Sequence, residues 1–148
     1  MNTRPSATVA AVIERGGRFL LVEETDAGEL RFNQPAGHLE QHESLIEACR
    51  REVLEESAWH FEPRELVGIY RWHSPENGVT YLRFAFCGQL GEREPGRKLD
   101  EGIVRAVWLL PQEIRDGRER HRSPLVLRCM EDYLSGKRYS MELLNEHA

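Results

Sequence analysis

The sequence of 148 residues predicts one domain of the α+β class, with helices packed on a β-sheet. Two observations support this. Short segments rich in β-branched and aromatic residues, bounded by glycine and proline turns, indicate strands. Two longer segments with apolar residues at helical spacing indicate helices. Because no repeat, low-complexity tract or linker divides the chain, we expect a single domain over residues 1–148.

The N-terminal part predicts a hairpin followed by a loop. Thr8–Ile13 is rich in β-branched residues and is expected to form a strand. Gly16 and Gly17 are expected to turn the chain into a second strand, Phe19–Glu23. Asp26–Pro35 is expected to be a loop.

Three further strands are expected in the second half of the chain. Glu65–His73 and Val79–Leu90 have strand composition, and Ser74–Gly78 between them is a strong turn signal. Gly91–Glu101 is expected to be a polar loop that leads into a strand over Ile103–Leu110.

Two helices are expected. The first covers about Glu43–Ser57. The second is bounded by Ser123 as N-cap, Pro124 at the first helical position and Gly136 after its end.

Composition excludes several classes of protein. A formal net charge of −5 argues against binding to a nucleic-acid polymer, which needs a basic surface. The apolar stretches are far too short for a membrane span, and we expect a cytoplasmic protein. Cys49, Cys87 and Cys129 include no CxxC pair, so we expect buried thiols and neither a zinc site nor a disulfide framework.

The first predicted helix carries carboxylates in an unfavourable arrangement. Glu52, Glu55 and Glu56 are spaced i, i+3 and i+4, so their charges repel one another on one flank. At about 100° per residue, Glu56 also falls inside the apolar arc. A bound divalent cation would compensate this charge, whereas a solvated acidic face would need no ligand, and the helix alone leaves both open. The apolar arc consists of Leu45, Ile46, Cys49 and Val53.

The loop before this helix favours the cation. Gly37 precedes Glu43 by six positions, and Arg51 follows eight positions after Glu43. Arg-Glu-Val-Leu-Glu-Glu then runs from Arg51 to Glu56. This string resembles the Nudix box in every charged position and in its spacing. Ala58 is the one departure, because the family usually has a glycine there to close the helix in a left-handed conformation.

The resemblance implies a Nudix fold, an α/β/α sandwich with a mixed β-sheet packed between helices. It also implies that Gly37, Glu52, Glu55 and Glu56 surround Mg²⁺, for which Mn²⁺ is a possible substitute. Arg51 would hold a glutamate in place and Glu43 would brace the loop. Glu52 and Glu55 are then candidate catalytic acids or bases, together with Asp100 or Glu101 at the end of the polar loop.

A narrower resemblance, to the NudJ-type phosphatase subgroup of Nudix proteins, extends over most of the chain. It rests on Asn33–Glu40, Arg122–Val126 and Ser135–Tyr139. The subgroup implies removal of terminal phosphate from nucleoside di- and triphosphates and from the pyrophosphate of the thiamine pyrimidine precursor.

Four residues are candidates for binding such a small phosphate substrate. Trp72 and His73 are placed to stack on a base, although Trp72 is as readily a rim residue of the core. Arg83 and Arg122 are candidates for contact with phosphate, although each is more commonly a surface charge.

Two other functions remain open at this stage. A pyrophosphatase of the same superfamily would cleave an internal bridge, as in ADP-ribose or a dinucleoside polyphosphate. A non-catalytic nucleotide sensor with the Nudix fold would bind without turnover, although such modules tend to lose the acids that are present here. The sequence is compatible with a monomer or a homodimer.

Overall fold

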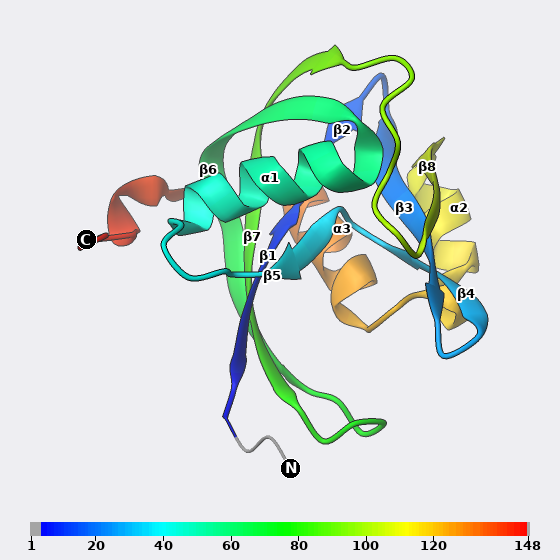
Figure 1. Cartoon of the computed structure of the whole chain (residues 1–148), viewed down its shortest axis with the longest axis horizontal. Coiled ribbons are helices and arrows are strands. Elements are labelled where there is room, and N and C mark those ends of the chain that lie inside the picture. Colours follow the sequence, from blue (N-terminus) through cyan, green and yellow to red (C-terminus); the bar gives the residue numbers. More distant parts are fainter. Residues whose placement is uncertain (1–3, 148) are drawn as a thin grey trace.

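The computed structural model describes residues 4–147 and divides the strands between two sheets (Figure 1). In the larger sheet, β1 is parallel to β7 and the other pairs are antiparallel, so this sheet is mixed, as expected. Its strand order is β5 (Ala36–His38), β1 (Ser6–Ala11), β7 (Thr80–Arg93), β6 (Trp59–His73) and β9 (Tyr139–Ser140).

The second sheet is built around one strand. β3 (Arg18–Asp26) pairs antiparallel with β2 (Glu14–Arg15), β4 (Glu29–Asn33) and β8 (Ile103–Leu109). β4 leads through Pro35 directly into β5, so the chain passes from this sheet into the larger one immediately before the first helix.

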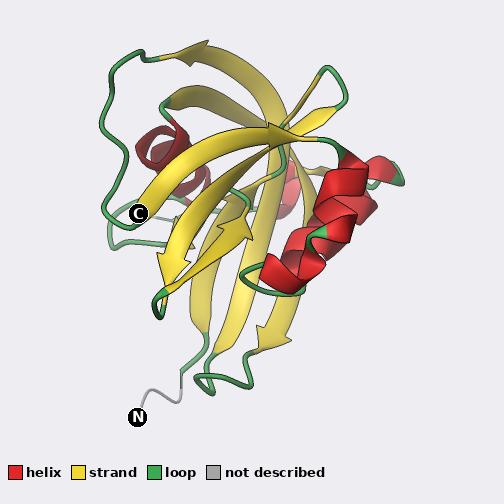
Figure 2. Cartoon of the chain, turned by 90° about the vertical axis from the view of Figure 1, so that its right-hand side faces the viewer, coloured by secondary structure: helices red, strands yellow, loops and turns green. Residues whose placement is uncertain are grey.

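Helices cover both sides of the strands, which confirms the expected α/β/α arrangement (Figure 2). α1 (Leu45–Ser57) lies on one side. α2 (Pro111–Asp116) and α3 (Leu125–Leu134) lie on the other side. Two short 3₁₀ helices, Arg118–Arg120 and Met141–Leu143, complete the described elements.

Each helical layer has its own apolar core. Cys49 and Val53 of α1 are fully buried against a cluster that includes Phe86, which confirms the predicted apolar face of this helix. Cys129 and Met130 of α3 are buried in a second cluster on the opposite side. All three cysteines are free and buried, as predicted. No helix within residues 4–147 is long and apolar enough to cross a membrane.

Several boundaries differ from the sequence prediction, and the reasons lie in tertiary pairing. Asp26–Pro35 is not a loop, because β3 extends to Asp26 and Glu29–Asn33 forms β4 beside it. α2 and β5 were not predicted, since both are too short to show periodicity.

β6 begins at Trp59 rather than Glu65, despite Pro63 within it. A register shift between Pro63 and Glu65 accommodates the proline, as expected of a bulge. Gly88 makes this possible, because a Cβ there would lie 2.0 Å from the carbonyl oxygen of Glu62.

The two long helices also begin slightly later than predicted. α1 starts at Leu45, with Ser44 as its N-cap. α3 starts at Leu125 with Pro124 as its N-cap, although the Ser123 hydroxyl still accepts a hydrogen bond from the Leu125 N–H, 3.1 Å.

The C-terminal end of α1 keeps the geometry that a glycine would give. Ala58 has φ 65° and ψ 11°, in the left-handed region, and its N–H donates to the Leu54 carbonyl. The substitution of glycine by alanine therefore leaves the helix end in place, with strain confined to one residue.

The N-terminal capping box of α1 predicts a stability effect. The Ser44 hydroxyl accepts a hydrogen bond from the Glu47 N–H, 3.0 Å, and Glu47 Oε1 accepts one from the Ser44 N–H, 2.9 Å. We expect Ser44→Ala to lower the free energy of unfolding by about 1 kcal/mol, measured by urea denaturation. Ser44→Asp, which keeps an acceptor, should stay close to wild type; equal losses in both variants would contradict a capping role.

Candidate functional site

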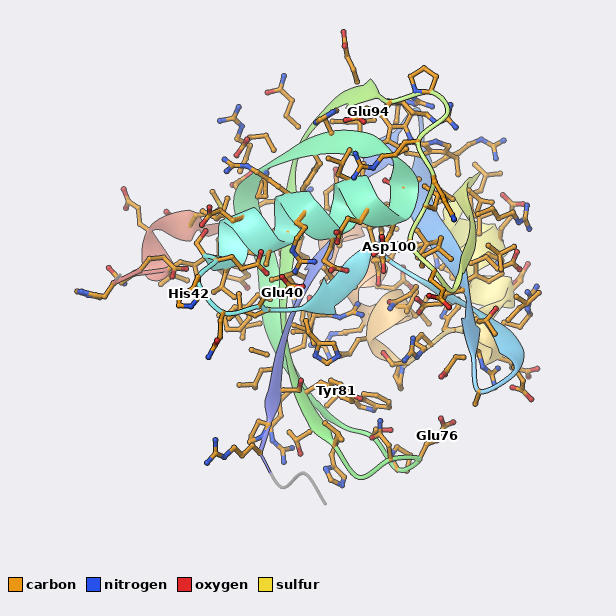
Figure 3. The ribbon with its side chains drawn as sticks, in the orientation of Figure 1. Glu40, His42, Glu76, Tyr81, Glu94 and Asp100 are labelled. Carbon is orange, nitrogen blue, oxygen red and sulfur yellow. The ribbon has the colours of Figure 1, made fainter. Side chains whose placement is uncertain are left out.

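A pocket of about 650 Å³ opens between α1 and the hairpin formed by β6 and β7. It is lined by Gly37, Glu52 and Glu56 of the expected metal-binding set, whereas Glu55 does not line it. It also contains three of the four expected substrate-binding residues. Figure 3 shows Asp100 beside the C-terminal end of α1 and Tyr81 on β7 of the hairpin. The residues that line the pocket include Glu24, Asp26, Asn33, Gly37, Glu52, Glu56, Trp72, Tyr81, Arg83 and Arg122.

Gly37 and Glu52 are in close contact at the wall of the pocket. β5 is paired with β1 at Val9, which fixes the backbone of Gly37 in front of α1. A Cβ built on Gly37 would lie 2.0 Å from Glu52 Oε2, so only glycine permits this approach. The spacing of the sequence motif thus corresponds to a contact between Gly37 of β5 and the Glu52 carboxylate of α1.

Arg51 forms hydrogen bonds with three carboxylates and an ion pair with a fourth, that of Glu40, 3.6 Å. Its Nε and Nη2 bond to the two oxygens of Glu43, 3.0 and 2.7 Å, and its Nη1 bonds to Glu52, 2.5 Å, and Glu55, 2.9 Å. Nη2 also donates to the carbonyl oxygen of His38 in β5. These bonds raise the pKa of Arg51 and lower that of Glu43. The guanidinium therefore links α1, its preceding loop and β5.

Two carboxyl groups of α1 are withdrawn from water. Glu52 and Glu56 are 9% and 8% exposed, as the helical arc predicted for Glu56. Burial raises the pKa of Glu52 to about 7, although Arg51 acts in the opposite direction. Burial raises the pKa of Glu56 to about 9, against the hydrogen bond from the Ala36 N–H to its Oε1, 2.9 Å. The negative charge of Glu52 also raises the pKa of Glu56, and the negative charge of Glu55 raises the pKa of Glu52.

The oxygen donors suit a hard divalent cation. Glu52 and Glu56 share the pocket with Gly37, and the cradle between Gly37 and Glu52 is too narrow for a Cβ. Among residues 4–147, no three His, Cys, Asp or Glu side chains converge as a complete metal site, and Arg51 has Glu52 and Glu55 as hydrogen-bond partners. Carboxylate oxygens are nevertheless the ligands that Mg²⁺ prefers, and the chemistry of this donor set fits that ion.

The polar loop brings Asp100 to the same region. The Asp100 N–H donates to the Glu55 carbonyl oxygen, 3.0 Å, and the negative charge of Asp100 contributes to the raised pKa of Glu52 and Glu56. Glu101 follows in the turn and is exposed. Of these two sequence candidates, Asp100 is thus the one electrostatically coupled to the buried carboxylates, and the catalytic role of Glu101 stays a prediction.

Of the four expected substrate-binding residues, Trp72, Arg83 and Arg122 line the pocket and His73 does not. Trp72 lines the pocket and stacks on Tyr81, with ring centroids 5.9 Å apart. His73 does not line the pocket, and its ring bonds to the Thr80 hydroxyl, 2.8 Å. Arg83 lines the pocket but is only 6% exposed, so it is not the surface charge that its residue type suggested.

Arg122 lies at the pocket wall in an ion-pair network. Its guanidinium bonds to Glu24, 2.8 Å, and to Asp26, 3.1 Å. Its N–H donates to the Phe32 carbonyl oxygen, which ties the segment before α3 to β4. Sequence reasoning did not single out Glu24, which is 9% exposed and whose charge also reaches Glu56. A single acid on a strand gives no periodic signal, so only the fold reveals it.

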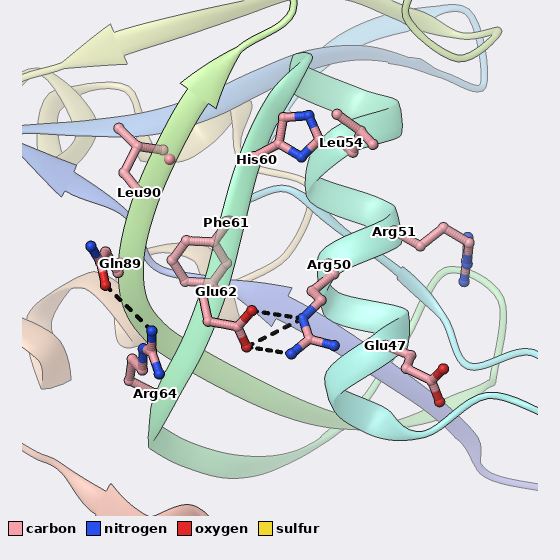
Figure 4. Close-up of a pocket in the computed structure, with 11 residues that line it drawn as sticks. Glu47, Arg50, Arg51, Leu54, His60, Phe61, Glu62, Arg64, Gln89 and Leu90 are labelled. Atoms are coloured by element: carbon pink, nitrogen blue, oxygen red, sulfur yellow. Dashed lines mark hydrogen bonds and ion pairs between the residues drawn. The ribbon is translucent and has the colours of Figure 1, made fainter.

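A second pocket, of about 730 Å³, lies on the other flank of α1 (Figure 4). Of its lining side chains, Arg50 pairs with Glu62, His60 pairs with Glu94, and Arg64 donates a hydrogen bond to Gln89. It contains neither Gly37 nor the buried carboxylates Glu52 and Glu56. The smaller pocket is therefore the candidate site, since chemistry rather than size decides between them.

The chain belongs to the Nudix family of hydrolases, because the NUDIX domain family matches residues 2–128. It is accordingly a hydrolase that acts on phosphoric anhydride bonds. The sequence is 38% identical over 143 residues to Phosphatase NudJ of Escherichia coli (strain K12), an alignment covering 97% of this chain and 92% of that protein. The expected resemblance to the family and to NudJ-type phosphatases is confirmed.

Solved structures confirm the fold. A NUDIX hydrolase from Nitrosomonas europaea has a TM-score of 0.95 and 54% sequence identity, covering 97% of this chain and 98% of its own. The MutT protein from Methanosarcina mazei Go1 has a TM-score of 0.71 with 23% identity, covering 93% of this chain and 99% of its own. The latter likeness concerns the fold alone.

The contact between Gly37 and Glu52 predicts the effect of one added methyl group. We expect Gly37→Ala to displace the Glu52 carboxylate and to reduce hydrolase activity by about 10²-fold or more, because small displacements at a reaction site have effects of this size. Steady-state kinetics with circular dichroism would measure this. Gly117→Ala adds the same methyl group outside the pocket, where the nearest contact of the Cβ would be the Glu113 carbonyl oxygen at 3.3 Å, and should retain activity. Full activity of Gly37→Ala would contradict the assigned contact.

Burial of Glu56 predicts an unusual pH dependence of stability without metal. Its pKa is raised from 4.5 to about 9, so between these values the folded state retains a proton that the unfolded chain loses. Stability should therefore fall as pH rises through this window. We expect Glu56→Gln, in the presence of chelator, to gain roughly 1 kcal/mol or more over wild type between about pH 5 and pH 8. Urea denaturation curves with the same pH dependence in both proteins would contradict this.

Proposed function

We propose that the protein is a Mg²⁺-dependent phosphatase that removes the terminal phosphate of nucleoside di- and triphosphates. The observation that carries the proposal is the pair of buried carboxylates, Glu52 and Glu56, beside the Gly37 backbone in one pocket. Two such groups without a cation are unfavourable on both charge and solvation grounds. Oxygen ligands of this kind are suited to Mg²⁺, with Mn²⁺ as an alternative.

The proposed roles of the residues follow from their contacts. Glu52 and Glu56 hold the ion together with the Gly37 carbonyl oxygen. When bound, Mg²⁺ supplies positive charge to the phosphate oxygens and lowers the pKa of a bound water. Arg51 fixes Glu52 and Glu55 in orientation through its hydrogen bonds. A carboxylate of Glu52, Glu55, Asp100 or Glu101 accepts the proton from the attacking water.

The choice of a terminal phosphate is supported by the likeness to a protein named Phosphatase NudJ. The pyrophosphate of the thiamine pyrimidine precursor is proposed as a further substrate on the same ground. Trp72 lines the pocket and offers a ring on which a base can stack. We also propose that residues 1–148 form one Nudix domain, that it acts in the cytoplasm as a monomer or homodimer, and that its partners are small phosphate compounds.

Product analysis tests this function directly. With Mg²⁺ and a nucleoside triphosphate, we expect orthophosphate and nucleoside diphosphate, resolved by ion-exchange chromatography. A nucleoside diphosphate should give orthophosphate and nucleoside monophosphate. Pyrophosphate as the main product, or turnover only of substrates with an internal bridge, would instead support the pyrophosphatase alternative.

Replacement of each proposed metal-binding glutamate by glutamine tests the assigned ligands. We expect Glu52→Gln and Glu56→Gln to lower kcat/KM by orders of magnitude, roughly 10³-fold. Glu62→Gln changes the same residue type outside the pocket, where Glu62 pairs with Arg50, and should retain wild-type turnover. Retained turnover in either pocket variant would refute the assigned ligands, and tight nucleotide binding without turnover in wild type would indicate a sensor.

A further inference from the structure

Arg83 is a buried cation in the pocket without a contacting negative charge. It lies in β7 opposite Tyr70 of β6 and Thr8 of β1, in the interior of the larger sheet. Its side chain is 6% exposed and lines the pocket. Among residues 4–147, no carboxylate lies within ion-pair distance, 4.0 Å, of its guanidinium. Burial of a charge in this way is unfavourable unless a counter-ion arrives.

Two amide side chains hold this guanidinium in one orientation. Nη1 donates to Gln34 Oε1 and Nη2 donates to Asn33 Oδ1, both 2.9 Å. The Gln34 amide nitrogen in turn donates to the Val126 carbonyl oxygen of α3, 2.8 Å, which fixes the oxygen toward Arg83. These partners are neutral, so they orient the cation without neutralising it.

The contrast with Arg122 indicates that this arrangement is specific. Arg122 shares the pocket, but Glu24 and Asp26 neutralise it, and its side chain is 42% exposed. Arg83 has neither a contacting acid nor solvent to screen its charge. A small anion entering the pocket therefore gains most from Arg83.

We infer that Arg83 is a specificity-determining residue that binds the terminal phosphoryl group of the substrate, held ready by Asn33 and Gln34. A terminal phosphoryl group has unesterified oxygens that accept from the remaining guanidinium N–H groups, whereas a bridged phosphate is substituted on both sides. This inference deepens the proposed function, on which it rests for the position of the phosphate relative to Glu52 and Glu56.

Binding of inorganic phosphate tests the inference without turnover. In Mg²⁺ buffer, titration calorimetry should show saturable phosphate binding to wild type, and Arg83→Gln should weaken it about tenfold or more. Arg83→Lys keeps the positive charge but loses the planar guanidinium, so its phosphate affinity should lie between those of wild type and Arg83→Gln. Arg105→Gln makes the same change in net charge at a residue paired with Glu23, and should bind phosphate as wild type does. Circular dichroism would check that each variant is folded. If Arg83→Gln does not fold, the phosphate affinity of Arg83→Lys is compared with that of wild type instead.

A capped probe tests the preference for a terminal group. Dimethyl phosphate, substituted on both sides, should bind wild type far more weakly than inorganic phosphate. Equal binding of the two probes, equal phosphate affinity in wild type and Arg83 variants, or no phosphate binding by wild type would overturn the inference. None of these results depends on hydrolysis, so an inactive protein with Arg83-dependent phosphate binding would refute the proposed function alone.

Discussion

The withdrawal of two carboxyl groups from water is the constraint on which the site depends. Glu52 and Glu56 lie on the face of α1 that packs toward the sheets, where burial raises their pKa values. Ordinary packing would place apolar side chains at such positions. Acids at these positions form a region that favours the binding of a cation. The surrounding structure has to keep the two carboxyl groups in a fixed orientation.

Three features of the fold provide this support. The strand β5 presents the Gly37 backbone to Glu52 and the Ala36 N–H to Glu56. Arg51 joins the helix to its preceding loop through Glu43 and to β5 through the His38 carbonyl oxygen. The capping box at Ser44 fixes where α1 begins, and hence the direction in which its acids point.

The sequence predicted the parts of the site that depend on local spacing. Helical spacing placed Glu52 and Glu56 on one flank of the helix, and the Nudix-box resemblance implied both as ligands together with Gly37. The structure brings these three residues into one pocket. Helix α3 and the long strands were also predicted, although β6 begins earlier because Gly88 permits a bulge around Pro63. Elements without periodicity, such as β4, were missed, because strand pairing rather than composition determines them.

Residues that depend on tertiary contacts were predicted less well. Arg83 was a candidate on residue type alone, and its burial between two amides became visible only in the fold. Glu24 carries no sequence signal, yet it forms an ion pair with Arg122, and its negative charge contributes to the raised pKa of Glu56. His73 lies beside the pocket residue Trp72 in sequence, but alternation along β6 directs the two side chains to opposite faces.

The most direct measurement of the central claim is calorimetric titration of Mg²⁺ into the metal-free protein and into the double variant Glu52→Gln/Glu56→Gln. The account predicts saturable binding to wild type that disappears in the double variant, while both proteins remain folded. Unchanged Mg²⁺ affinity after loss of both carboxylates, or no binding by wild type, would contradict it.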